Sequence, residues 1–226
     1  MRISPKSSNV LFWGMMGTDP STTIKDSSAN GYDVSTTGSP PVIKLRNGNY
    51  GLDFDGSGDN ARTSSAFTVT EANSYTLAVW LNTDVWTYGI PFSIGGGAVG
   101  TWQMRLQVHT TAGNKYILLG VGKNGVAFSS IQITSSAFAT GENFMLIGTY
   151  NASDNSMVLY YNGIEVASGT YSKGAGTSST RMDIGSTDYV GSVNSRFPGK
   201  IMSPIVLNYF FNADQSLQLY KDTYIY

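Results

Sequence analysis

The chain contains no cysteine, and charged residues are scarce. Without cysteine, neither a disulfide framework nor a thiolate metal site can form. Charged residues make up 13% of the 226 residues, about half of the roughly 25% that is typical of soluble domains. The formal net charge is −1, and no run of like charges occurs. The sequence therefore has no basic stripe for phosphate binding, and we expect no nucleic-acid partner.

The N-terminal segment Met1–Val10 lacks the apolar core of a secretory signal peptide. No stretch approaches the ~20 consecutive apolar residues of a membrane span, so we expect no membrane partner. If Met1 is the native start, the chain is made in the cytoplasm without a signal peptide.

The residues that are abundant favour an all-β protein. The chain has 26 glycines and 14 tyrosines, and its only glutamates are Glu71, Glu142 and Glu165. Threonine, which is frequent here, suits a half-exposed pleated surface, whereas helical surfaces usually rely on Lys and Glu. The Ser/Gly/Thr-rich segment Ser172–Thr180 has the length of a loop rather than of a linker. We therefore expect one domain over residues 1–226.

Runs of alternating apolar and polar residues, bounded by Gly, Asn, Asp and Ser, predict strands along the chain. The expected strands are Val10–Met16, Tyr50–Asp55, Ala61–Ser64, Tyr75–Asn82, Gly89–Ile94, Trp102–Thr110, Lys115–Val121, Ala127–Ile133, Phe144–Tyr150, Met157–Tyr161, Ile164–Tyr171, Arg181–Ile184 and a final pair around Gly199–Phe211. We also place Trp13 and Trp80 in the core, with Trp80 between two sheets. A short helix is expected at Ala213–Lys221, with Asn212 as its N-cap and Gln215 at the capping-box position.

Five short motifs follow one another in a fixed order. They are Asp-Ser-Ser-Ala-Asn-Gly at Asp26–Gly31, Leu-Asp-Phe-Asp-Gly at Leu52–Gly56, the Trp-bearing strand Tyr75–Leu81, Ile-Gly-Thr-Tyr at Ile147–Tyr150, and Leu-Tyr-Tyr-Asn-Gly at Leu159–Gly163. In this order and spacing they resemble the laminin G-like, concanavalin A-like lectin superfamily. The resemblance implies a two-sheet antiparallel jelly-roll β-sandwich with one short C-terminal helix, and a binding or structural role.

One motif departs from the family pattern. Family members often read Gly-x-Ile-Asp-Glu where this chain has Gly-Lys-Ile-Met-Ser at Gly199–Ser203. The acidic pair is missing, so no role of those acids carries over.

The resemblance also points to calcium, which is common in laminin G-like domains and needs several oxygen ligands. Asp26, Asn30, Asp55 and Asp59 lie in two loops that would have to converge to bind it. The alternative is that Asp26 and Asn30 form Asx-turns and that Asp59 caps a loop. No cofactor is required on either interpretation.

Three aromatic residues are candidates for ligand binding. Trp86, Tyr88 and Trp102 lie in or beside the Gly-rich segment Gly89–Gly100, where exposed rings could stack on sugars. Aromatic residues of a β-sandwich more often belong to its core.

The sequence is poor in catalytic groups, so we predict a protein that is not an enzyme. Glycoside hydrolysis needs paired carboxylates, and no glutamate lies near another acid at a suitable spacing. The remaining enzymatic alternative is an alginate-lyase-like polysaccharide lyase, which Gln107-Val-His109 and Tyr171-Ser-Lys173 resemble; it would use His109 and Tyr171. Such lyases are expected to have an arginine-rich strand as well, but the strand that contains His109 has a single arginine, Arg105.

Two functions of different classes fit these observations. The first is a non-catalytic structural, decoration or adhesion subunit of an extracellular assembly, most plausibly on the surface of a phage virion. It would contact other virion proteins and glycans, and it is compatible with a homo-oligomer. The second is a carbohydrate-binding module associated with glycan-degrading enzymes.

Overall fold

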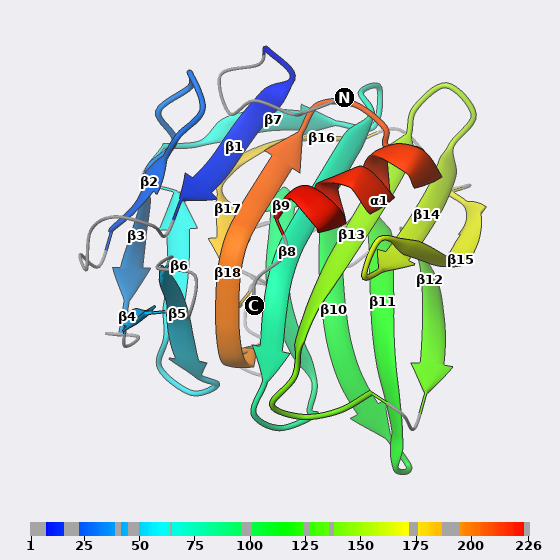
Figure 1. Cartoon of the computed structure of the whole chain (residues 1–226). Helices are drawn as coiled ribbons and strands as arrows, with labels where there is room; N and C mark the ends of the chain where they lie inside the picture. Colours follow the sequence, from blue (N-terminus) through cyan, green and yellow to red (C-terminus); the bar gives the residue numbers. More distant parts are fainter. Residues whose placement is uncertain are drawn as a thin grey trace.

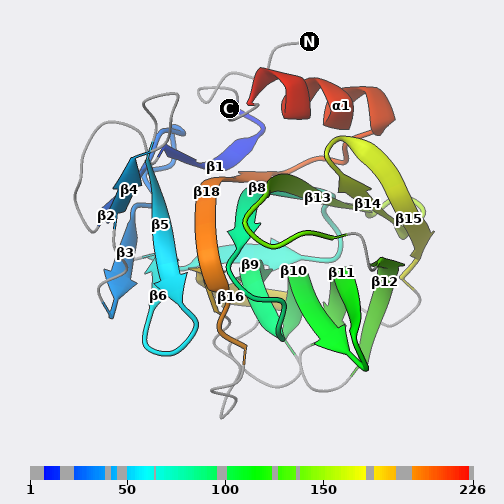
Figure 2. The same ribbon diagram turned by 60° about the horizontal axis from the view of Figure 1, so that its bottom comes forward.

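The computed structural model describes residues 8–15, 23–38, 42–44, 50–63, 65–95, 101–123, 127–135, 138–171, 176–186 and 195–223. These residues form two antiparallel layers (Figures 1 and 2). We call the layers the front sheet and the back sheet, as they lie in Figure 1.

The front sheet runs in the order β1 (Val10–Met15), β18 (Pro198–Leu207), β8 (Tyr75–Thr83), β13 (Asn143–Asn151), β14 (Ser156–Tyr161) and β15 (Ile164–Thr170). β5 (Tyr50–Asp55) also pairs with β18, and β4 (Val42–Lys44) pairs with β5.

The back sheet runs in the order β12 (Ala127–Ser135), β11 (Asn114–Lys123), β10 (Trp102–Thr111), β9 (Gly89–Gly95), β17 (Met182–Ile184), β6 (Asn60–Thr63), β3 (Val34–Thr37) and β2 (Thr23–Asp26). A β1–β2 pair joins the two sheets along one edge, so the sandwich is partly closed like a barrel. A separate ribbon pairs β7 (Phe67–Thr70) with β16 (Thr177–Thr180).

The all-β sandwich with one short C-terminal helix is confirmed. Several boundaries differ from the prediction: β2, β3, β4 and β7 were not expected, and β16 occupies the end of the predicted loop Ser172–Thr180. The predicted final pair of strands is the single long strand β18 followed by a turn. The missed strands have three or four residues each, too few to establish a period of two.

The main core lies between the two sheets. Alternation on β8 directs Leu77, Val79 and Leu81 inward, and all three are buried in this core. Gly148 on β13 shows how closely the sheets approach each other. A Cβ atom there would lie 2.7 Å from Leu119 Cδ1 of the back sheet, so any larger residue would force the core leucines to shift.

A second core lies on the outer face of the front sheet. Helix α1 (Ala213–Asp222) lies over this face (Figure 2). The predicted capping box is present: Gln215 N donates to Asn212 Oδ1 at 2.9 Å, and Asn212 N donates to Gln215 Oε1 at 3.0 Å. Leu219 on α1 is buried against the sheet. In the described part of the chain, no helix has the length and apolarity that a membrane crossing requires.

Trp80 belongs to this second core, so its predicted place between the sheets was wrong, although it is only 1% exposed. Its ring stacks on Tyr220 at 5.4 Å between centroids, and its Nε1 donates to Thr223 Oγ1 at 3.0 Å. Because side chains alternate along β8, Trp80 points to the side opposite to Val79 and therefore out of the main core. Trp13, expected in the core, is only partly buried against the same second cluster.

Replacing Trp80 with alanine should destabilise the protein by about 3–5 kcal/mol, because it removes a buried ring and leaves a cavity under α1. Denaturant titration measures this loss. Trp13→Ala, at a partly exposed position, should cost less. A loss below about 1 kcal/mol for Trp80→Ala would show that α1 does not hold this ring in a well-packed core.

Candidate functional site

The outer face of the back sheet brings polar and aromatic side chains together on three neighbouring strands. Strict alternation on β10 turns Met104, Leu106 and Val108 into the core and leaves the intervening residues outside. The pairing register then aligns β10 with β11 and β12. We call this surface the β10–β12 face; it comprises Arg105, Gln107, His109, Tyr116, Leu118, Phe128 and Gln132.

A stack of rings marks one end of the face. His109 and Tyr116 are paired in register, and their rings lie parallel, 4.4 Å apart between centroids with an interplanar angle of 4°. Tyr88 approaches His109 at 6.4 Å between centroids. Burial lowers the pKa of His109, which favours a neutral imidazole near neutral pH. The two parallel rings therefore form an aromatic pair at this end of the face.

A second stack marks the other end. The Phe128 ring lies directly over Gly120, where a Cβ atom would collide with Phe128 Cε1. The Arg105 guanidinium lies over the same ring at 4.2 Å from its centroid. Glycine at position 120 thus allows the ring to lie flat on the sheet, and the ring in turn supports the arginine.

Between the stacks the surface is amphipathic. Tyr116 and Gly120 are four residues apart on β11, which corresponds to about 13 Å. Leu118 lies between them and is flanked in register by Gln107 and Gln132. The Gln107 Oε1 atom is buried and has no hydrogen-bond partner in the structure. The face thus combines aromatic rings, a largely buried leucine and side-chain amide groups, which are residue types found in the sites of amphipathic small ligands.

Two of the three predicted aromatic ligand-binding residues are not exposed. Trp86 stacks on Phe144 in the core and Trp102 is 0% exposed, whereas Tyr88 is 41% exposed beside His109. Both tryptophans lie in the main core because their side chains point between the sheets. The prediction missed Tyr116 and Phe128, although the alternation of Trp102–Thr110 could have indicated the outer face of β10.

The four residues proposed for calcium do not form one site. β3 pairs with β6, with Val34 opposite Thr63 and Thr37 opposite Asn60. The loop that carries Asp26 and Asn30 precedes Val34, whereas the turn that carries Asp55 and Asp59 adjoins Asn60. The two loops therefore lie at opposite ends of this strand pair and cannot share an ion.

The side-chain oxygens in both loops already accept hydrogen bonds from the chain. Asp26 Oδ1 accepts from Ser28 N at 2.8 Å, and Asp26 Oδ2 accepts from Ser28 Oγ at 2.6 Å. The Asn30 amide donates to Val10 O at 3.0 Å. Within the described residues, no group of three or more His, Cys, Asp or Glu side chains is placed to hold a metal. Calcium binding stays a prediction, but Asp26, Asn30, Asp55 and Asp59 do not form a single ligand set for it.

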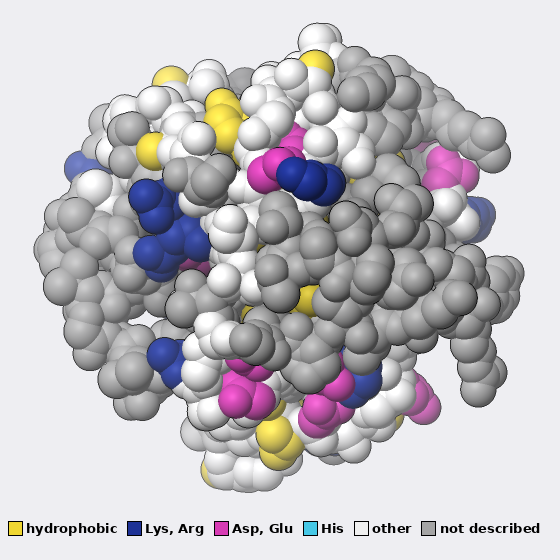
Figure 3. Space-filling view, turned by 90° about the vertical axis from the view of Figure 1, so that its left-hand side faces the viewer, with side chains coloured by type: hydrophobic (Ala, Val, Ile, Leu, Met, Phe, Trp, Pro, Cys, Tyr) yellow, Lys and Arg dark blue, Asp and Glu magenta, His cyan; other side chains and the backbone are white. Residues whose placement is uncertain are grey.

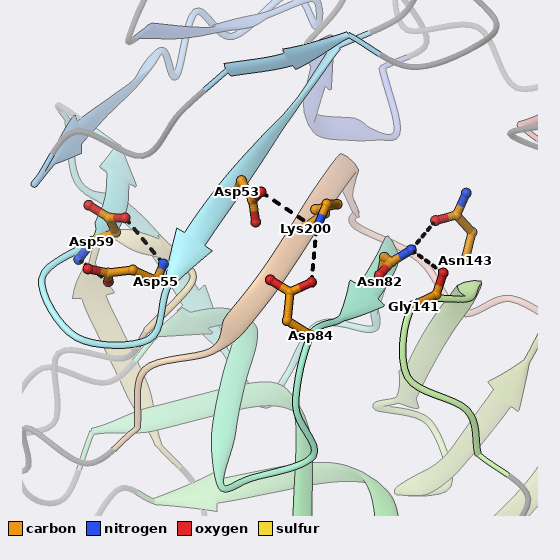
Figure 4. Close-up of polar contacts among 8 residues, drawn as sticks. All are labelled: Asp53, Asp55, Asp59, Asn82, Asp84, Gly141, Asn143 and Lys200. Carbon is orange, nitrogen blue, oxygen red and sulfur yellow. Dashed lines mark hydrogen bonds and ion pairs between the residues drawn. The ribbon is translucent and has the colours of Figure 1, made fainter.

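Asp55 instead closes the turn between β5 and β6 (Figure 4). Its Oδ1 accepts from Ser57 N at 2.7 Å and from Gly58 N at 3.0 Å, while its Oδ2 accepts from Ser57 Oγ at 2.6 Å. These hydrogen bonds hold the pKa of Asp55 well below its usual value. Asp59, which is buried, accepts from Asp55 N at 3.3 Å.

Because the folded-state pKa of Asp55 is depressed, its contribution to stability is fully present above the unfolded-state pKa of about 3.9. This contribution is lost as the pH falls towards the folded-state pKa. Asp55→Asn should therefore reduce the pH dependence of the unfolding free energy below about pH 4. Denaturant titrations between about pH 4 and pH 2 measure it; equal slopes for both proteins would contradict the role of the turn.

A second polar group, around Lys200 and Asn82, lies on the outer face of the front sheet, since their neighbours Ile201 and Leu81 point into the main core (Figure 4). Lys200 on β18 contacts Asp84 at 2.9 Å and Asp53 at 3.5 Å. The Asn82 amide donates to Gly141 O and to Asn143 Oδ1, each at 2.9 Å. Lys200 pairs with two carboxylates, and the Asn82 amide donates two hydrogen bonds. These contacts connect the residues after β8 and before β13 to the front sheet.

The motif that departs from the family pattern adjoins this group. Met202, which stands at the first acidic position of that pattern, is buried in the second core under α1.

Figure 3 views the side of the molecule formed by β2, β3, β5 and β6, where acidic and basic side chains lie in small neighbouring groups. On this side the described charges therefore form no extended patch of one sign.

The residues of the lyase alternative are not brought together. Tyr171 is buried in the main core and meets Tyr150 edge to face at 6.0 Å between centroids. Tyr150 in turn lies 5.8 Å from Trp102, at the start of β10. His109 lies seven residues further along β10, about 23 Å away, and on the outer face. Lys173, the third residue of that motif pair, lies outside the described residues.

Comparison with known proteins identifies a family whose model matches this sequence. Residues 55–215 match the model of the concanavalin A-like lectin/glucanases superfamily. A search of curated protein sequences finds no match.

Solved structures with a similar fold include binding domains. The chain superposes on domain 4 of AbnA, a GH43 extracellular arabinanase from Geobacillus stearothermophilus solved with arabinotriose, with a TM-score of 0.67, 16% identity, and coverage of 93% of this chain and 98% of that domain. The binding domain of Paraclostridial mosquitocidal protein 1 superposes with a TM-score of 0.69 and 13% identity, over 95% of this chain and 52% of that one. The receptor-binding domain of botulinum neurotoxin type G superposes with a TM-score of 0.66 and 14% identity, over 95% of this chain and 51% of that one. The chain thus spans about half the length of these toxin domains.

Proposed function

Because the chain belongs to the concanavalin A-like lectin/glucanases superfamily, as residues 55–215 show, we propose that it is a non-catalytic glycan-binding module that uses the β10–β12 face. The observation that carries this proposal is the pair of ring stacks, His109 with Tyr116 and Phe128 with Arg105, on either side of Leu118. Sugars have apolar ring faces and polar edges, and a surface that carries aromatic side chains and amides can contact both.

The front sheet offers no comparable surface among the described residues, because α1 covers its outer face and Lys200 and Asn82 are engaged below it. The fold likeness to domain 4 of AbnA, which was solved with arabinotriose, supports a glycan as ligand. That domain is matched over 98% of its length, so the likeness concerns the whole of that domain.

Tyr116→Ala should weaken glycan binding at least about tenfold, because the substitution removes one of the two rings of the His109–Tyr116 pair. A glycan array followed by calorimetry of the best ligand measures this effect. Ile164→Ala is a matched control, since Ile164 is 66% exposed but lies at the start of β15 in the front sheet. Equal affinities of both variants and the parent protein would exclude the β10–β12 face as the binding site.

We expect the protein to turn over no uronate polymer, because Tyr171 is buried far from His109 and the lyase pair is therefore not assembled. Incubation with alginate, followed by absorbance of the unsaturated product, tests this expectation. Turnover that disappears in His109→Ala would show that the protein is an enzyme after all.

The biological setting is the finer part of the proposal. We infer a module that acts outside the cell, either beside a glycan-degrading enzyme or as a subunit of a virion surface with other virion proteins as partners. The likeness to an arabinanase domain supports the first setting, and the second rests on the sequence alone. Neighbouring genes distinguish the two: glycosidase genes support the first, and capsid and tail genes support the second.

A further inference from the structure

The β10–β12 face lies in a part of the chain that carries no acidic residue. Residues 85–141 contain no Asp or Glu, although the whole chain has 15 of them and a net charge of −1. Strands β9 to β12 all lie within this segment. The basic residues of the segment are Arg105, His109, Lys115 and Lys123. This half of the back sheet therefore contributes basic groups and no carboxylate.

Arg105 is the charged side chain that these strands place on the face. It is half-buried, and its guanidinium carbon lies over the Phe128 ring, 4.2 Å from the ring centroid. Lys115 differs, because its ammonium donates to Phe138 O and lies 5.7 Å from the centroid of Trp86, a residue of the main core. His109 contributes little charge near neutral pH, since burial lowers its pKa.

Among the residues that the structure describes, the acidic group nearest to Arg105 in the strand register of the outer face is Asp183. It lies on β17, opposite Ser93 of β9, and Ser93 in turn lies opposite Arg105. Asp183 forms an ion pair with Arg62 at 2.6 Å, which offsets its charge. Among the described residues, the outer face of β6, β17, β9 and β10 thus carries two arginines, Arg62 and Arg105, and one carboxylate, Asp183.

We infer that the ligand of the β10–β12 face is an acidic glycan, whose carboxylate or sulfate group binds at Arg105 while a sugar ring packs on the neighbouring aromatic stacks. This inference rests on the proposed glycan-binding function and adds the charge class of the ligand. A planar guanidinium binds such anions through parallel hydrogen bonds. Partial burial strengthens the attraction because solvent screens it less.

The test compares two oligosaccharides with the same sugar backbone, one with free carboxylates and one with these groups methyl-esterified and therefore uncharged. Trigalacturonate and its fully methyl-esterified form have the same backbone, and calorimetry at low salt compares their affinities for the parent protein, Arg105→Gln and Lys221→Gln. Lys221 is exposed on α1 against the opposite sheet, so its variant matches the loss of one charge away from the face. A sulfated galactan oligosaccharide in a parallel titration distinguishes sulfate from carboxylate recognition.

We expect one of the acidic ligands to bind about tenfold or more tightly than the ester, because a charge-assisted hydrogen bond is added. Arg105→Gln should abolish this preference and Lys221→Gln should keep it. Equal binding of the acidic ligands and the ester, with both lost in Tyr116→Ala, would overturn the acidic class and leave glycan binding intact. If none of these binds and a glycan array is also silent, the proposed function fails with it.

Discussion

The front sheet buries both of its faces, and the rest of the structure depends on this constraint. β8 lies near its centre, and residues of alternating direction meet the back sheet on one side and α1 on the other. An antiparallel sheet with two apolar faces requires a cover on each. The C-terminal helix supplies the outer cover, with Trp80 stacked on Tyr220 at the contact. The short helix is therefore part of the core rather than an appendage.

The back sheet has a different task. Its inner face completes the main core through Met104, Leu106 and Val108, and no helix of the described chain lies on its outer face. Because no helix that the structure describes packs on it, this outer face does not require apolar side chains, and polar and aromatic residues occupy it. Glycines at two positions of β11, Gly120 and Gly122, leave room on this side; Phe128 lies over the first. The front sheet thus packs on both of its faces, whereas the back sheet packs on its inner face and carries the candidate site on its outer face.

Polar groups elsewhere have mainly structural roles. Asp26 and Asp55 each organise a loop through backbone and hydroxyl donors, and Lys200 joins two carboxylates across β5 and the end of β8. Such local hydrogen bonds explain why residues that look like metal ligands in the sequence are not available as one ligand set. Asx-type turns use the same oxygen atoms that a hard cation would need.

Local signals in the sequence were sufficient for the class of fold, the long strands and the helix. Alternation along Tyr75–Asn82 and the capping box at Asn212 act within a few residues, so they can be recognised without knowing the partners. Short strands such as β3 and β4 could not be predicted, because three or four residues acquire their conformation from pairing with distant strands. The same holds for the site. Whether Trp102 or Tyr116 is exposed depends on which face of its strand meets the other sheet, and whether Asp26 approaches Asp55 depends on strand pairing. The sequence alone determined that strands would form and that their side chains would point alternately to the two faces of each sheet. Only the tertiary structure decided which face became core, because burial results from the packing of sheets that are far apart in the chain.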